Sequence, residues 1–162
     1  MRRAILFAGV MVAIGAIASP AIAKSDKEFL SDAIKGDNSE IALGELAAQK
    51  GTSDGVRSFG RTLVDDHRQT RDEATTLATD LEVKVSGTMT DTAQSEVEKL
   101  QRMSGSEFDK AFVDYMLSNH QKDIAEFEEK AGEGDRQVSK LAKKTLPMLQ
   151  KHLQLAQSLS NH

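Results

Sequence analysis

Three of the four histidines in this chain lie where a helix normally buries apolar side chains. His67, His120 and His152 each fall on the apolar stripe of a different predicted helix. A buried imidazole loses its hydration, so its ring nitrogens need hydrogen-bond partners or a metal ion. Three such rings from three helices therefore predict a polar or metal-binding centre inside a helical bundle.

Carboxylates fall on the same helix faces as these histidines. Because an α-helix rises about 1.5 Å per residue, all of these side chains can reach one layer in the middle of a bundle. The candidate metal ligands are Glu40, His67, His120, Asp123 and His152. Asp37 and Asp66 are the supporting candidates, and the position of Asp66 next to His67 predicts that it orients that imidazole.

The ligand types suit a transition metal, namely Zn, Cu, Fe or Mn, without choosing among them. They do not match the di-iron carboxylate bundles, in which Glu-x-x-His pairs supply the ligands. The residues three positions before the histidines are Val64, Leu117 and Leu149. A ferritin-type oxidase centre is therefore not expected.

Three interpretations of function follow from these residues. The leading one is a non-enzymatic envelope protein whose buried centre binds a transition metal, in metal handling or envelope stress tolerance. The alternative is a structural or partner-binding protein whose polar layer only fixes the packing of the helices. The third is a metal-dependent oxidoreductase, although the sequence names no substrate.

Apolar residues recur at helical spacing through most of the chain. The spacing predicts helices over 26–50, 56–81, 91–103, 108–131 and 138–159, with an N-cap at Ser106 before the fourth. The connector over 83–105 is longer than antiparallel neighbours need. We therefore expect an all-α, ferritin-like four-helix bundle, made of two helical hairpins joined by a crossover that contains a short helix. Gly44, on a buried face, predicts a close approach of two helices.

The first residues predict the compartment. Arg2 and Arg3 precede an apolar run over 4–18, and the small residues of Ala21-Ile22-Ala23 follow a helix-breaking proline. This pattern is typical of a secretory signal peptide over residues 1–23, cleaved before Lys24. An uncleaved anchor is the alternative, but the apolar run is shorter than the ~20 residues that span a bilayer. We expect a periplasmic protein with one domain over 24–162 and no transmembrane segment after cleavage.

Charge and cysteine content narrow the range of partners. The chain carries 21 basic and 25 acidic residues, and the predicted cleavage would remove two basic residues and no acidic one. An acidic chain without a basic stripe argues against nucleic acid and against anionic membranes as partners. The chain has no cysteine, which excludes a lipid-modified cysteine and leaves stability to core packing. A metal ion is the one partner that the residues suggest, and the oligomeric state stays open.

Several motifs together resemble a bacterial exported family, the domain of unknown function 4142 family. The motifs are the stretch over 39–47, Phe59 with Asp66-His67, Ser104-Gly105 with Phe108-Asp109 and His120, and Leu146-Pro147 with His152-Leu153 and Ala156. The resemblance implies a ferritin-like four-helix bundle outside the cytoplasm and no established activity. Phe112 departs from the family, which tends to carry tyrosine there, so any role of that hydroxyl is absent or shifts to Tyr115.

Overall fold

The computed structural model describes residues 24–134 and 136–161, and over these residues the chain is all-α. It has five helices and no strand in these ranges, which are α1 (Asp26–Lys50), α2 (Asp54–Asp80), α3 (Asp91–Gln101), α4 (Gly105–Gly132) and α5 (Gln137–Ser160). The prediction of an all-helical chain is confirmed. The expected signal peptide over 1–23 lies outside the described residues. Among the described helices, none combines the length and the apolar content that crossing a membrane would require.

Polar side chains cap three of the five helix starts among the described residues. Ser25 and Glu28 form a capping box at α1, and the hydroxyls of Ser53 and Thr90 accept hydrogen bonds at the starts of α2 and α3. The predicted N-cap at Ser106 is wrong. Gly105 adopts a φ of 64°, which glycine tolerates without a steric cost, so the turn is complete before Ser106 and α4 already begins at Gly105.

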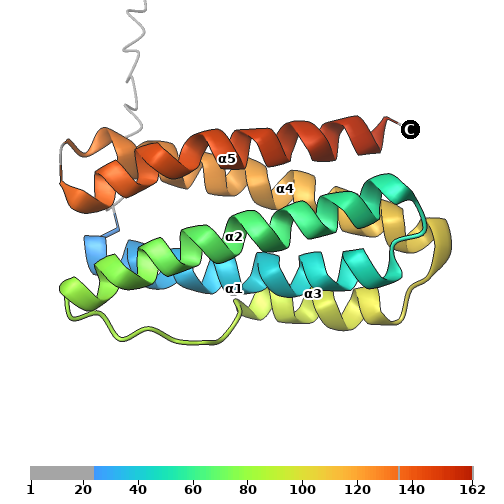
Figure 1. The fold of residues 1–162 in the computed structure, drawn as a ribbon, viewed down its shortest axis with the longest axis horizontal. Coiled ribbons are helices and arrows are strands. Elements are labelled where there is room, and N and C mark those ends of the chain that lie inside the picture. Colours follow the sequence, from blue (N-terminus) through green and yellow to red (C-terminus); the bar gives the residue numbers. More distant parts are fainter. Residues whose placement is uncertain (1–23, 135, 162) are drawn as a thin grey trace, which may run out of the picture.

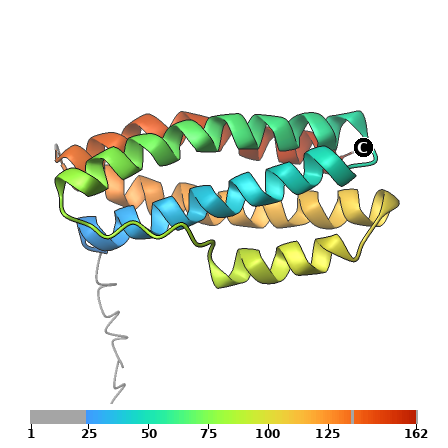
Figure 2. The ribbon, with the colours of Figure 1, turned by 60° about the horizontal axis from the view of Figure 1, so that its bottom comes forward.

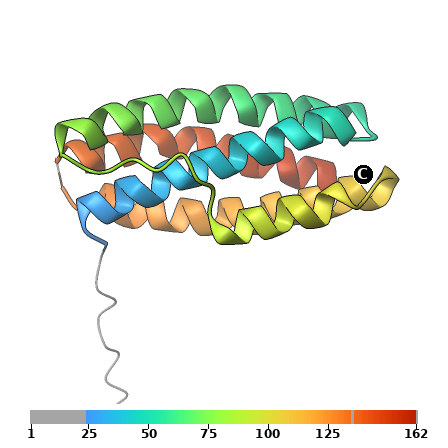
Figure 3. The ribbon, with the colours of Figure 1, turned by 90° about the horizontal axis from the view of Figure 1, so that it is seen from below.

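The four long helices run lengthwise as two antiparallel pairs (Figure 1). Helix α1 packs along α2, and α4 packs along α5, while further contacts join α2 to α5 and α1 to α4. The segment over 81–90 and α3 together return along the length of the molecule from the end of α2 to the start of α4 (Figures 2 and 3). Helix α3 thereby lies against α1 and α4.

The α1–α2 pair is held at close range by two glycines. A Cβ placed on Gly44 would lie 2.7 Å from the carbonyl oxygen of Gly60, and one placed on Gly60 would lie 2.5 Å from the carbonyl oxygen of Gly44. Real Cβ atoms do not approach backbone oxygens so closely, so any larger residue would push the helices apart. The expectation of a close helix approach at Gly44 is confirmed.

The apolar core is divided into two clusters. The first contains Leu43, Ala47, Val56, Phe59, Leu63, Ala93, Leu100, Phe108, Phe112, Val113, Met116 and Ala156. The second contains Phe29, Leu30, Ile34, Ala74, Ala78, Ala131, Val138 and Ala142. In the chain order of each long helix, buried polar residues separate the two sets. They are Asp37, Ser39 and Glu40 on α1, His67 on α2, His120 on α4, and Thr145 and His152 on α5.

Candidate metal centre

His67 is fixed from α2 by a carboxylate of α1. Its Nδ1 lies 2.8 Å from Oδ1 of Asp37, and the hydroxyl of Thr70 donates to the same oxygen at 2.8 Å. A carboxylate oxygen accepts, so the Nδ1–H of His67 is the donor and Nε2 carries the lone pair of the neutral ring. Nε2 is buried and has no hydrogen-bond partner among the described residues.

His120 is fixed within its own helix. Its Nδ1 lies 3.0 Å from the backbone carbonyl oxygen of Met116, one turn earlier on α4. Because a carbonyl only accepts, Nδ1 of His120 donates and Nε2 is left as the acceptor of the neutral ring. The side chain is completely buried.

His152 reaches across from α5 to a carboxylate of α2. Its Nε2 lies 2.9 Å from Oδ2 of Asp66, which also accepts from Lys151 at 3.2 Å. Burial acts to raise the pKa of Asp66, but the hydrogen bonds from His152 and Lys151 outweigh it and hold that pKa below its usual value. Asp66 was expected to orient His67 and instead orients His152. Adjacent helix residues point about 100° apart, so Asp66 cannot face its neighbour.

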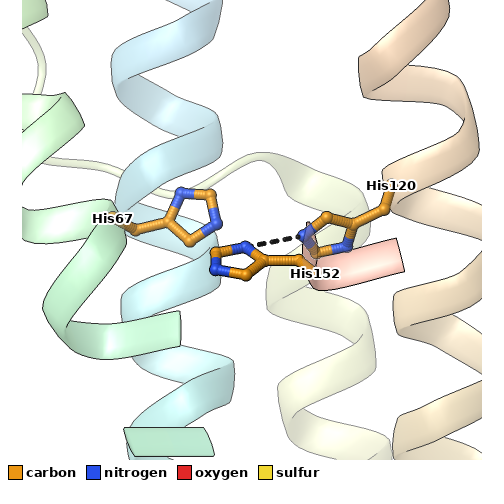
Figure 4. A group of neighbouring side chains, drawn as sticks. All are labelled: His67, His120 and His152. Carbon is orange, nitrogen blue, oxygen red and sulfur yellow. Dashed lines mark hydrogen bonds between the residues drawn. The ribbon is translucent and has the colours of Figure 1, made fainter. Parts of the chain in front are cut away.

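The three rings converge in the interior (Figure 4). Their centroids lie 5.2 Å apart for His67 and His152, 5.3 Å for His120 and His152, and 6.1 Å for His67 and His120. One ring nitrogen from each lies within 4.8 Å of the other two. The structure thus brings together the three histidines that the sequence singles out.

The contact between His120 and His152 lacks a proton in the neutral rings. Nε2 of His120 and Nδ1 of His152 lie 3.3 Å apart, the contact dashed in Figure 4. Both rings already give their single N–H to Met116 or Asp66, so two lone pairs face each other. Only a shared cation, either a proton or a metal ion, turns this contact into an attraction. Two nitrogens bound to one tetrahedral Zn²⁺ at about 2.0–2.1 Å would lie about 3.3–3.4 Å apart.

The pKa values of the three rings divide them into two kinds. Burial, together with the neighbouring His67, lowers the pKa of His120 to about 3 and that of His152 to about 4. These two rings are therefore neutral at neutral pH and able to bind metal. Burial also acts to lower the pKa of His67, but the hydrogen bond with Asp37 and the charges of nearby carboxylates raise it above its usual value. A metal ion must compete with a proton at His67 alone.

Glu40 and Asp123 lie beside the histidines and are joined to each other. The amide nitrogen of Asn119 donates to Oε1 of Glu40 and to Oδ2 of Asp123, at 2.8 Å in both cases. The ligand atoms that lie within 4.8 Å of one another come from the three histidines, and neither carboxylate belongs to that group. Burial raises the pKa of Glu40 to about 7 and that of Asp123 to about 6. The structure joins these two carboxylates through Asn119, and their role as metal ligands together with the histidines stays a prediction.

A pocket of about 420 Å³ opens between α1 and α4 beside this pair. Its wall includes Glu40, Asp123 and Asn119, and it extends inward as far as His67 and the α5 residues Thr145 and Leu149. The half-buried Tyr115 also lines it, and burial with the charges of Glu40 and Asp123 raises the pKa of its hydroxyl. The sequence pointed to Tyr115 as the residue to which the role of the family's tyrosine hydroxyl could shift, but it did not predict the pocket.

Two partners in this region escaped the sequence analysis. Asn119 stands next to His120 and one turn before Asp123, a spacing that could have suggested a shared face. Thr70 follows His67 by three residues, and its hydroxyl also contacts the carbonyl oxygen of His67, as threonines in helices commonly do. Neither spacing is distinctive enough to mark a site without the fold.

Comparison with known proteins gives a fold and a family. No curated protein matches this chain. The crystal structure of a DUF305 fragment from Deinococcus radiodurans superposes with a TM-score of 0.72 at 13% identity, covering 84% of this chain and 95% of that one. At that identity the likeness shows a shared helical fold alone. The sequence pattern of the family described as Domain of unknown function (DUF4142) matches residues 13–159. The chain therefore belongs to the DUF4142 family.

Proposed function

We propose that this protein is an exported metal-binding protein that holds one transition metal ion between His67, His120 and His152. The observation that carries the proposal is the arrangement of the six ring nitrogens. Each ring has one nitrogen committed to a protein acceptor, which is Asp37, the Met116 carbonyl or Asp66. The other nitrogen of each ring is left to face the neighbouring rings. Metal-binding histidines in proteins show this division, in which the outer N–H fixes the ring and the inner nitrogen binds.

The donor set favours a borderline metal ion. Neutral imidazoles suit Zn²⁺, Cu²⁺ and Fe²⁺, and three of them leave a further position for water or another ligand. A metal ion at the three inner nitrogens would remove the repulsion between the lone pairs of His120 and His152. The ion would also occupy the unpartnered Nε2 of His67.

The location and architecture belong to the same proposal. The charged, apolar and small-residue segments of 1–23 support export to the periplasm with cleavage before Lys24. The pairing of α1 with α2 and of α4 with α5 supports a ferritin-like bundle with the 81–104 connection as its crossover, forming one domain over 24–162. We propose a role in metal handling or envelope stress tolerance, without catalysis.

Metal titration of the cleaved, metal-free protein tests this function. Zn²⁺, Cu²⁺, Fe²⁺ and Mn²⁺ are added separately at neutral pH, and bound metal is measured after desalting. We expect about one ion of the preferred metal per chain, lost in His120→Ala. Phe112→Leu is the matched control, because it weakens the buried core of α4 without touching a nitrogen. If the wild-type chain binds none of the four ions, or binds only an ion that His120→Ala also binds, the histidines form a register-fixing polar layer instead.

A further inference from the structure

Among the charged residues that line the pocket beside the histidine centre, acids outnumber bases. Its wall carries five carboxylates and two lysines; the carboxylates are those of Asp32, Asp37, Glu40, Asp123 and Glu126. Low-dielectric walls bearing one sign of charge concentrate ions of the opposite sign. The pocket is therefore suited to a small cation.

Three of these carboxylates already have partners of their own. Lys24 pairs with Asp32 and Glu126. Asp37 accepts from His67 and Thr70. The two that remain are Glu40 and Asp123, which have only the neutral amide nitrogen of Asn119 between them.

One side-chain oxygen of Glu40 is buried and has no partner among the described residues. Its side chain is 1% exposed, yet it lines the pocket, and its Oε2 has no hydrogen-bond partner among the described residues. A buried carboxylate oxygen without a partner is costly unless a proton or a cation compensates for it. Glu40 thus keeps a buried, unpartnered oxygen at the wall of the pocket, and Asn119 joins its other oxygen to a second carboxylate, that of Asp123.

We propose that Glu40 and Asp123 bind a divalent cation through their oxygens, separately from the histidine centre, and that metal reaches His67 through this pocket. Asn119 and Tyr115 also line the pocket, and their side chains carry neutral oxygen donors. Such a set suits hard cations such as Mn²⁺, whereas the imidazoles suit Zn²⁺ or Cu²⁺. The access role rests on the proposed function of the histidines, but the oxygen-ligated site does not.

Mn²⁺ binding tests the site directly. Free Mn²⁺ is followed by electron paramagnetic resonance during titration of the cleaved, metal-free protein. We expect one ion bound by the wild type and an affinity at least about tenfold lower in Glu40→Gln/Asp123→Asn. Asp65→Asn/Glu129→Gln removes the same charge from exposed positions of α2 and α4 and should bind as the wild type does. No Mn²⁺ binding by the wild type, or equal affinity in the two double variants, overturns the site.

The access role is tested by the rate of Zn²⁺ loading, measured by stopped flow against a fluorescent zinc indicator. We expect Glu40→Gln/Asp123→Asn to load at least about tenfold more slowly than the wild type, with the same final stoichiometry. An unchanged rate overturns the access role. His120→Ala should keep its Mn²⁺, so a failure of the histidine centre is distinguished from a failure of the carboxylate site.

Discussion

The two halves of the buried polar layer differ in how their polar atoms are partnered. In the histidine half, every outer nitrogen donates to a fixed acceptor, and the three rings lie in contact with one another. In the carboxylate half, Glu40 keeps a buried oxygen without a partner and faces a pocket. The first half has its ligand geometry set in advance by hydrogen bonds, whereas the second leaves one buried carboxylate oxygen without a hydrogen-bond partner in the described part of the chain.

The contrast between the histidine half and the carboxylate half shows that burial alone does not define a binding site. Both halves are buried, and burial shifts the pKa of groups in both, downward for His120 and His152 and upward for Glu40 and Asp123. In each case the neutral form is favoured, as expected when water is excluded. For an imidazole the neutral form is the one that binds metal, but for a carboxylate it is not. His120 and His152 are thus ready to bind, while His67 and the carboxylate half must first lose their protons.

Removal of one imidazole ring should have the largest effect on Zn²⁺ affinity. In His152→Ala the Zn²⁺ affinity should fall by about 10³-fold, because one of three ligands is lost from a site worth about 10–16 kcal/mol. Competition with a chelator of known affinity measures this loss. Leu155→Ala is the control, because Leu155 is exposed and lies one turn after His152 on α5. This variant should bind Zn²⁺ as the wild type does. An equal affinity in His152→Ala would show that the ring is not a ligand.

Removal of a carboxylate that accepts from an outer ring nitrogen should have the second-largest effect on Zn²⁺ affinity. Asp66→Asn and Asp37→Asn each remove a carboxylate that fixes one ring, and Zn²⁺ affinity should fall by about 10–100-fold in either variant. The same chelator competition measures the change. Asp65→Asn is the matched control, since its side chain is exposed beside Asp66 on α2. Full affinity in both acceptor variants would mean that the rings hold their positions without these hydrogen bonds.

Zn²⁺ affinity should depend on pH through His67 and not through the other two rings. Because the pKa of His67 is raised above its usual 6.5, its proton begins to compete with metal above that pH. Zn²⁺ affinity should therefore fall by about tenfold for each pH unit below the pKa of His67. Isothermal titration in several buffers of different ionisation enthalpy should show release of about one proton at slightly acidic pH. An affinity that does not change over this range would contradict the protonation of His67.

A last effect should be on the stability of the metal-free protein. Glu40 has a pKa of about 7 in the folded chain and 4.5 in its usual state. Between these values the unfolded chain loses a proton that the folded chain keeps, so stability falls as the pH rises and stays low above 7. Glu40→Gln removes this loss and should raise the free energy of unfolding by on the order of 2 kcal/mol above pH 7.

Urea unfolding at about pH 5 and about pH 8 measures that change. Glu98→Gln, exposed on α3, controls for the loss of one surface charge. The gain of Glu40→Gln over the wild type should be larger at the higher pH. An equal gain at both values would show that Glu40 has its ordinary acidity in the fold.

The helices and the converging histidines could be predicted from the sequence for one reason. Apolar positions repeat at helical spacing, and a polar side chain that interrupts such a stripe must face inward with it. The hairpin turns then fix how far along each helix the interruption falls. His67, His120 and His152 met in one layer because each interrupts a stripe at a similar distance from its turn.

The partners of these residues could not be predicted, because they depend on how helices are rotated against each other. Asp66 reaches α5 rather than its own neighbour, and this choice follows from the packing of α2 on α5. Asn119 joins α4 to α1 in the same way. The pocket depends on side-chain volumes between α1 and α4 that no periodic pattern contains. The start of α4 was missed for a local reason, since the left-handed turn at Gly105 is not visible in apolar spacing.

The division of the core into two apolar clusters has a consequence for the way the molecule opens. Cooperative units in proteins follow contiguous apolar packing, and here such packing is interrupted at the layer of imidazoles and carboxylates. The two ends of the metal-free molecule should therefore exchange their amide hydrogens at different rates, as two separate units. An ion bound at this boundary by His67 of α2, His120 of α4 and His152 of α5 would couple the two ends, so that they unfold together or not at all.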